Sequence, residues 1–138
     1  MVDIEISYEG ELRCSAVHGP SAFELVTDAP VDNCGRGQSF SPTDLVATAL
    51  GTCVLTMMGI VAHRHDWDIT GVRGAVRKHM VADPQRRIER LVVKITGGAQ
   101  LDADARKVLE RAALTCPVNE SLGERIIREF CFDWDVTP

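Results

Sequence analysis

An uncharged run of 18 residues, from Leu45 to Ala62, restricts the fold of this chain more than any other feature of its sequence. A run of that length reaches the lower limit for a membrane-spanning helix. However, threonines and glycines interrupt the run, and the flanking sequence on both sides resembles that of a soluble domain. We therefore expect a central helix that is covered on nearly every side by the rest of the domain, and no membrane partner.

Length and charge narrow the class of protein further. The chain has 138 residues, 45% of them hydrophobic, which is enough for one domain (residues 1–138) with its own core. Its net charge is -5 and its basic residues are dispersed, so no face suited to nucleic acid is predicted. The N-terminal sequence MVDIEISYEG lacks the positive and apolar regions of a signal peptide, so a cytoplasmic location is expected.

Hydrophobic periodicity predicts several strands. Residues 4–29 alternate around the turn HGPS, which indicates two or three strands joined by hairpins, and residues 31–40 form a glycine-rich loop. Two further strands are expected at 66–80 and 86–98, around the turn ADPQ, and a last one at 125–136.

Two helices are expected between these strands. Ser41 can cap a helix, Pro42 suits its first turn and Asp44 supplies a capping-box carboxylate, so the first helix should extend from Pro42 to about His63. The second should begin at Asp102 or Asp104. Its inward-facing stripe is Val108, Leu109, Ala112, Ala113 and Cys116. Pro117 then breaks or kinks this helix, which places Cys116 at a discontinuity. Strands, a long helix, a hairpin, a second helix and a final strand make an α+β domain.

The chain has five cysteines, Cys14, Cys34, Cys53, Cys116 and Cys131. Their odd number and wide spacing are unlike a secreted disulfide framework. A cysteine inside an apolar helix, such as Cys53, usually packs in a core, whereas Cys116 lies beside a helix break and polar residues, where a reactive thiol is equally plausible. No C-x-x-C or H-x-x-x-H spacing supports a zinc site with His63 and His65, so no metal is expected.

Two segments, FSPTDLVATALGTCVLTMMGI and ERAALTCPVNESL, occur in an order that resembles the OsmC/Ohr family, the osmotically inducible and organic hydroperoxide resistance proteins. The resemblance extends from YEGEL near the N-terminus to FDW near the C-terminus. It implies antiparallel sheets packed around two central helices, in an intertwined homodimer with active sites at the subunit interface. It also implies an antioxidant oxidoreductase of the oxidative stress response that needs no bound cofactor.

The resemblance assigns roles to particular residues. Cys53 takes the peroxidatic position: its thiolate attacks an organic hydroperoxide, an alcohol leaves, and the sulfenic acid condenses with Cys116 to a disulfide that an external dithiol reduces. An arginine should hold the thiolate while a carboxylate orients the arginine. Arg13 is the favoured arginine and Arg36 the alternative.

Asp44 is the candidate for the carboxylate, and a plain capping-box role is the other interpretation of it. The family often has Asn-Pro-Glu at this helix start, whereas the present chain has Ser41-Pro42-Thr43 and an acid only at the next position. Nine residues of helix place Asp44 on the face opposite Cys53 and ~13 Å away along the axis. A bend in the helix, or partners from a second subunit, would be needed to bring these groups together.

An apolar lining would accept the organic tail of a hydroperoxide. The candidate lining residues, which ordinary core packing would also explain, are Leu50, Met57, Met58, Phe40 and Phe23. The rival functions are a noncatalytic dimer that binds a small hydrophobic ligand and a thiol-based redox sensor.

Overall fold

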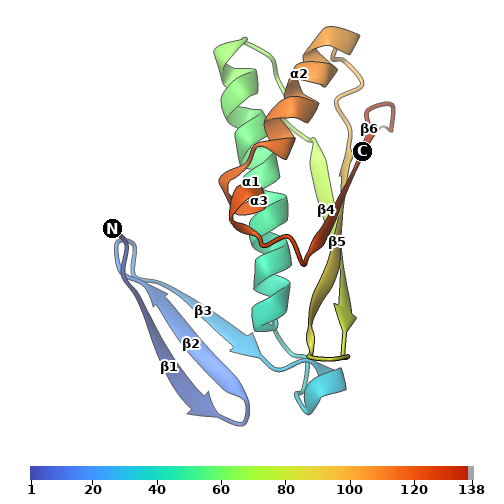
Figure 1. Ribbon diagram of the computed structural model, residues 1–138. Coiled ribbons are helices and arrows are strands. Elements are labelled where there is room, and N and C mark those ends of the chain that lie inside the picture. The colour runs from blue at the N-terminus through green and yellow to red at the C-terminus, as the bar shows by residue number, and fades with distance from the viewer. Residues whose placement is uncertain (137–138) are drawn as a thin grey trace. The chain divides into compact units, whose positions relative to one another are not determined.

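The computed structural model describes residues 1–136, which form parts of two compact units, Met1–Val46 and Ala47–Pro138. The first unit begins with a three-stranded antiparallel sheet in the order β1-β2-β3 (Figure 1). Its strands are β1 (Ile4–Gly10), β2 (Arg13–His18) and β3 (Phe23–Asp28). The hairpins expected from the alternating sequence are therefore confirmed.

One face of this sheet is apolar. Ile4, Ile6 and Tyr8 alternate along β1 and so share a face, which continues through Ala16 of β2, opposite Ile6, to Leu25 of β3, opposite Ala16. The side chains of Ile4, Ile6 and Tyr8 are all more than half exposed in the single chain. This apolar sheet face thus has no cover within the first unit.

A loop follows β3 and leads to the long helix. It opens with the 3-10 turn η1 (Val31–Asn33) and returns along β3, where the Asp28 N–H donates to the Phe40 carbonyl at 3.1 Å. A Cβ atom at Gly35 would lie 1.7 Å from the carbonyl oxygen of Ala29, so only glycine allows this close return.

Helix α1 (Pro42–Arg64) has the boundaries that its sequence signals predict. The capping box is formed: the Ser41 N–H donates to Asp44 Oδ2 at 2.8 Å, and the Asp44 N–H donates to Ser41 Oγ at 3.2 Å. Pro42 occupies the first turn, where a missing N–H costs nothing.

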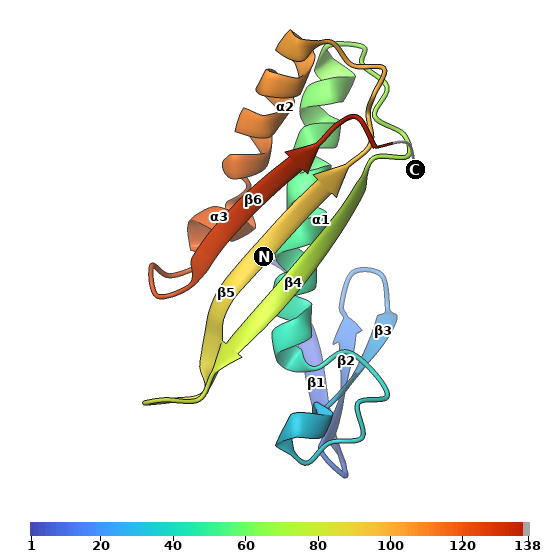
Figure 2. The ribbon, with the colours of Figure 1, turned by 90° about the vertical axis from the view of Figure 1, so that its right-hand side faces the viewer.

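The second unit contains a sheet in the order β4-β5-β6, with α1 and α2 on one of its faces (Figures 1 and 2). Its strands are β4 (Arg73–Val81), β5 (Arg87–Thr96) and β6 (Ile127–Asp133), and its other helices are α2 (Ala103–Leu114) and α3 (Pro117–Ser121). Almost fully buried side chains from the helices and the sheet form its core, among them Leu50, Val54, Met58, Leu91, Val93, Ile95, Leu109, Ala113 and Cys116. The predicted inner faces of β5 and α2 are confirmed.

Three details differ from the expectations. β6 runs parallel to β5, because the chain between them crosses over through α2 and α3, whereas β1-β2-β3 and the β4-β5 pair are antiparallel. The strand expected from residue 66 begins at Arg73, since a turn forms first, in which Asp68 Oδ1 accepts the Thr70 N–H at 2.8 Å. The chain also forms a separate short helix, α3, after the break at Cys116.

Helix α1 is less covered than expected. By length and composition alone it is a candidate membrane span, as the central helix of a soluble protein also is, and 33% of its most apolar stretch is buried in the single chain. Its exposed stripe consists of small or apolar residues at spacings of three and four: Ala49, Thr52, Thr56 and Ile60. Within the described chain, one side of α1 therefore has no packing partner.

Candidate functional site

The second unit brings Cys53 and Cys116 together. Cys53 lies half-buried in the middle of α1, and Cys116 is fully buried between α2 and α3. The two side chains lie close enough for Cys53 to affect the pKa of Cys116, and both thiols are free. Residues 63 positions apart in the sequence thus form one pair of thiols.

The break in the chain at Cys116 explains its position. Cys116 has extended backbone angles, φ -69° and ψ 141°, as expected for a residue before proline, and Pro117 starts α3. The Cys116 sulfur caps this helix by accepting the Asn119 N–H at 3.3 Å. This hydrogen bond holds the sulfur in place at the junction where α2 ends and α3 begins.

Burial raises the pKa of the Cys116 thiol above its ordinary value, and the adjacent Cys53 side chain raises it further, against the opposing effect of the Asn119 N–H. Cys116 is therefore protonated at neutral pH. Cys53 is the more accessible of the two thiols. Two adjacent free thiols can release two electrons and form a disulfide.

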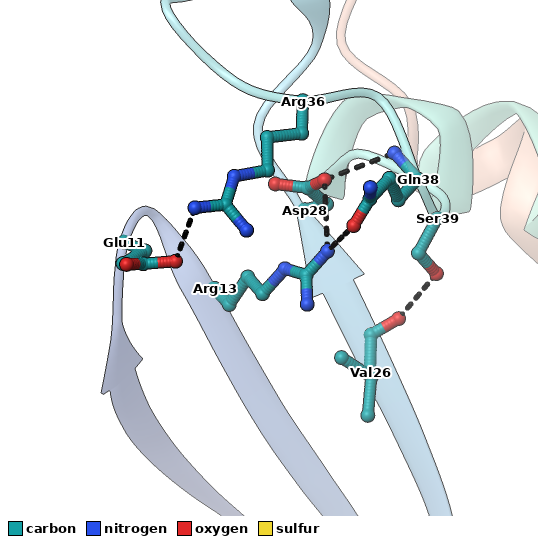
Figure 3. A network of polar contacts seen from close by, with 7 residues as sticks. All are labelled: Glu11, Arg13, Val26, Asp28, Arg36, Gln38 and Ser39. Atoms are coloured by element: carbon teal, nitrogen blue, oxygen red, sulfur yellow. Dashed lines mark hydrogen bonds and ion pairs between the residues drawn. The ribbon is translucent and has the colours of Figure 1, made fainter.

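The first unit holds a second cluster of polar groups around Arg13 (Figure 3). Nη2 of Arg13 lies 3.6 Å from Oδ2 of Asp28 and also donates to Oε1 of Gln38. The Asp28 side chain is 0% exposed and the Arg13 side chain 32% exposed, so the guanidinium extends from a buried carboxylate toward the surface.

The loop before α1 completes this cluster. The Gln38 N–H donates to Oδ2 of Asp28 at 2.9 Å, and Ser39 Oγ donates to the Val26 carbonyl at 2.7 Å, which fastens the loop to β3. The Gln38 N–H and the Arg13 charge lower the pKa of Asp28, and their effect exceeds the opposing effect of desolvation. Asp28 is therefore ionised at neutral pH and forms an ion pair with Arg13.

Arg36, the other candidate arginine, is engaged elsewhere. It forms an ion pair with Glu11 at 2.6 Å, and both side chains are more than half exposed. An exposed pair of this kind contributes little to stability. The structure thus gives Arg13 a partly buried, organised setting and Arg36 a solvated one.

The remaining predicted residues have diverse positions. Asp44 forms the capping box, and its Oδ2 also accepts the Ser41 hydroxyl at 2.7 Å. Leu50 and Met58 are fully buried in the core, while Met57 is half-buried one helical turn after Cys53. Phe23 and Phe40 belong to the first unit and are 69% and 51% exposed.

No cluster of three or more His, Cys, Asp or Glu side chains suited to a metal ion occurs among residues 1–136. His63 and His65 are exposed near the end of α1, and the ring of His65 stacks on Trp67 at 4.4 Å.

Asp28 and Gln38 were not identified from the sequence. A signal for Asp28 exists: a four-residue turn at 19–22 pairs His18 with Phe23, and counting back along that hairpin pairs Arg13 with Asp28. Opposite charges that face each other in an antiparallel pair attract. No comparable signal exists for Gln38, because it lies in an irregular loop.

The chain is similar to known proteins in sequence and in fold. The family model for OsmC-like proteins matches residues 35–129. A protein from Psychrobacter arcticus, provisionally named as an osmotic stress induced and detoxification response protein, is 44% identical, with a TM-score of 0.90 over 96% of each chain. No protein with a curated description matches the chain.

More distant structures share the fold. An organic hydroperoxide resistance protein OsmC from Legionella pneumophila is 15% identical, with a TM-score of 0.74 over 96% of each chain. An organic hydroperoxide resistance protein from Elizabethkingia anophelis is 13% identical, with a TM-score of 0.73 over 97% of this chain and 96% of that one. At these identities the likeness concerns the fold alone.

Proposed function

Because this chain belongs to the family of OsmC-like proteins, we propose that it is a thiol-dependent peroxidase that reduces organic hydroperoxides to alcohols. Family membership and the neighbouring structures support a peroxide-related or redox role in general terms. The single observation that carries the finer proposal is the proximity of the half-buried Cys53 to the buried, protonated Cys116, whose pKa it raises.

The proposed reaction transfers two electrons from the thiol pair to the peroxide. The Cys53 thiolate attacks the distal oxygen of the hydroperoxide, the O–O bond breaks, and the alkoxide leaves as an alcohol after it takes up a proton. Cys53 is then a sulfenic acid. The Cys116 sulfur attacks the Cys53 sulfur, water leaves, and the disulfide forms; an external dithiol returns both cysteines to thiols.

The first step requires an ionised Cys53. An unperturbed thiol is only a few per cent ionised at neutral pH, so a cation must favour the thiolate. Arg13 is our candidate, since its side chain is partly exposed and a buried carboxylate holds one of its nitrogens. Arg36, bound to Glu11 in an exposed pair, is the weaker candidate.

A homodimer forms part of the proposal. The apolar face of β1-β2-β3 and the exposed stripe of α1 both lack a packing partner within the described chain. A three-stranded sheet of this size needs its apolar face covered to be stable. A second copy of the chain would cover both surfaces.

The apolar lining of the site also remains a proposal. Met57 lies beside Cys53 along α1, and Leu50 lies one turn before it with its side chain in the core. Phe23 and Phe40 are exposed in a single chain and would supply apolar surface at a subunit interface. Such a lining favours an alkyl or aryl hydroperoxide over hydrogen peroxide.

We also propose a cytoplasmic location, because thiols stay reduced in that compartment and the proposed reaction needs free thiols.

The test is turnover of cumene hydroperoxide in the presence of a dithiol. Cys53→Ser should abolish turnover. Cys116→Ser should form no protein disulfide, so its remaining turnover depends on direct reduction of the Cys53 sulfenic acid by the dithiol. Cys131→Ser, at an exposed cysteine on β6, should match the wild type. Full turnover by Cys53→Ser would contradict the proposal. Disulfide formation without sustained turnover would favour a redox sensor, and no thiol reaction at all would favour a ligand-binding protein.

A further inference from the structure

We propose that Asn119 is a positioning residue for disulfide formation: it fastens the end of α2 to the start of α3 and thereby holds the sulfur of Cys116 near Cys53. This inference rests on the proposed function, in which these two thiols form a disulfide, and adds a residue that takes no part in the bond changes. All three residues belong to the second unit.

Asn119 contacts both sides of the break between the two helices. Its side-chain Nδ2 donates to the carbonyl of Leu114, the last residue of α2, at 2.8 Å. Its backbone N–H, in the first turn of α3, donates to the sulfur of Cys116 at 3.3 Å. One residue thus ties the end of α2, the thiol and the start of α3 together.

The geometry of the break explains why this additional contact matters. Cys116 has extended backbone angles and so belongs to neither helix, and Pro117 has no N–H to donate. The carbonyl of Leu114 lies in the last turn of α2, where the helix itself supplies no donor. The Asn119 side chain supplies that donor from the far side of Cys116.

The other end of α3 is fixed as well. Nη1 of Arg128, on β6, donates to the carbonyls of Leu122 and Gly123 at 2.9 and 3.1 Å, just after α3 ends. α3 is therefore attached to the sheet after its last residue and to α2 at its start. A change at Asn119 should loosen only the end that carries Cys116.

The remaining atom of the Asn119 amide argues against a role in stability alone. Its Oδ1 is buried and has no hydrogen-bond partner among residues 1–136. A buried acceptor without a partner costs free energy, which an apolar side chain of similar size would avoid. The two hydrogen bonds that Asn119 donates are therefore its contribution, and both bear on the position of Cys116.

A fixed sulfur favours the disulfide. Cys116 is buried, and Cys53 lies close enough to raise its pKa, so the two thiols are neighbours before any oxidant reacts. Groups that the protein already holds in place lose little freedom when a bond forms between them. If the start of α3 were loose, closing the disulfide would also have to order the residues around Cys116.

The experiment measures the equilibrium between the reduced full-length protein and oxidised dithiothreitol at pH 7. Two electrons and two protons pass from the thiols to the reagent, the S–S bond of the reagent breaks, and the bond between Cys53 and Cys116 forms. Acid quenching and peptide mass spectrometry give the fraction of protein in which these two cysteines are linked. Asn119→Ala should lower the equilibrium constant about fivefold to tenfold, because roughly one more residue must be ordered.

Asn119→Asp separates positioning from helix capping. Aspartate has the same shape but no N–H for the Leu114 carbonyl, while its charge suits the first turn of a helix. Because Cys116 is protonated at pH 7, the new charge meets no thiolate there. This variant should lower the equilibrium constant at least as much as Asn119→Ala does.

The matched control is Ser121→Ala in the same helix. It removes the hydrogen bond from Ser121 Oγ to the Pro117 carbonyl at 2.8 Å and leaves both contacts of Asn119 in place. Its equilibrium constant should match that of the wild type.

Two results would overturn the inference. Either Asn119 variant could match the wild type, which for Asn119→Asp would mean that Asn119 only stabilises α3. Ser121→Ala could also lower the constant as much as the Asn119 variants do. The measurement involves no peroxide, so the expected constants in a protein that fails to turn over cumene hydroperoxide would contradict the proposed function and leave this inference standing. Full turnover with unchanged constants would do the reverse.

Discussion

At the scale of single residues, the two thiols differ because their surroundings differ. Cys116 is fully buried and caps α3, and burial together with the neighbouring Cys53 raises its pKa. Cys53 is half-buried beside the exposed stripe of α1. This difference in accessibility is the reason why the proposed reaction gives the attack on a substrate to Cys53 and the later, internal reaction to Cys116.

This asymmetry predicts the reactivity of each cysteine toward a thiol reagent. In the native protein at pH 7, iodoacetamide should modify the exposed Cys34 and Cys131 and leave Cys116 intact, because Cys116 is both buried and protonated. Because the pKa of Cys116 is raised above its ordinary value of 9.0, its thiolate should form only in more alkaline solution than that of an ordinary cysteine. Peptide mass spectrometry before and after unfolding measures the alkylation of each cysteine. If native Cys116 were labelled as fast as Cys34, the conclusion that Cys116 is buried would be contradicted.

At the scale of elements, α1 approaches the sheet closely through a glycine. A Cβ atom at Gly51 would lie 2.7 Å from Cγ2 of Val76 on β4, and valine has little rotamer freedom with which to move away. The helix and the sheet therefore fit together at this point only because residue 51 has no side chain.

The clash in Gly51→Ala should accordingly lower the free energy of unfolding by about 1–3 kcal/mol. The higher helix propensity of alanine should offset up to about 1 kcal/mol of this loss. Val76→Ala removes the clashing methyl groups. In that background the same Gly51→Ala change should be neutral or stabilising, and the two substitutions should show strong coupling in denaturant unfolding. Simple additivity of the two effects would contradict the close contact.

The elements that the sequence predicted well are those with local signals. Ser41, Pro42 and Asp44 mark the start of α1 within one turn, and strict alternation marks β5. The parallel direction of β6 has no local signal, since it depends on where the crossover through α2 and α3 ends. The start of α3 has one, proline at its first position, but the prediction went no further than a break at Pro117.

The candidate site divides in the same way. Cys53 and Cys116 were identified because each lies in a motif of the family, and in the structure Cys53 is near enough to raise the pKa of Cys116. Asp28 and Gln38 were missed because their contacts depend on strand register and on the path of an irregular loop. Asp44 is a residue with a local signal: the sequence predicted its capping box with Ser41, and the structure forms it.

At the scale of the whole molecule, two uncovered surfaces are the basis of the proposed homodimer. Ile4, Ile6 and Tyr8 form the uncovered face of the first sheet, and Ala49, Thr52, Thr56 and Ile60 form the uncovered stripe of α1. Contiguous apolar surface of this kind marks an interface in proteins that stay in solution. The homodimer would account for both surfaces together.

Adjacent residues of β1 provide a matched test of this homodimer. Ile6→Lys places a charge on the apolar face and should produce monomers or unfolded protein, whereas Glu5→Lys changes the opposite face and should leave the dimer intact. Sedimentation velocity measures both. A wild-type monomer, or an Ile6→Lys variant that remains a stable dimer, would exclude this face as the interface.

The central claim is that Cys53 and Cys116 together reduce a hydroperoxide, and mass spectrometry after a single equivalent of cumene hydroperoxide tests it most directly. The reduced protein should consume the peroxide, lose two hydrogen atoms and yield one cross-linked peptide pair that contains Cys53 and Cys116. In Cys116→Ser the same treatment should instead add one oxygen atom at Cys53. Peroxide that remains unconsumed, or a disulfide that excludes Cys53, would contradict the claim.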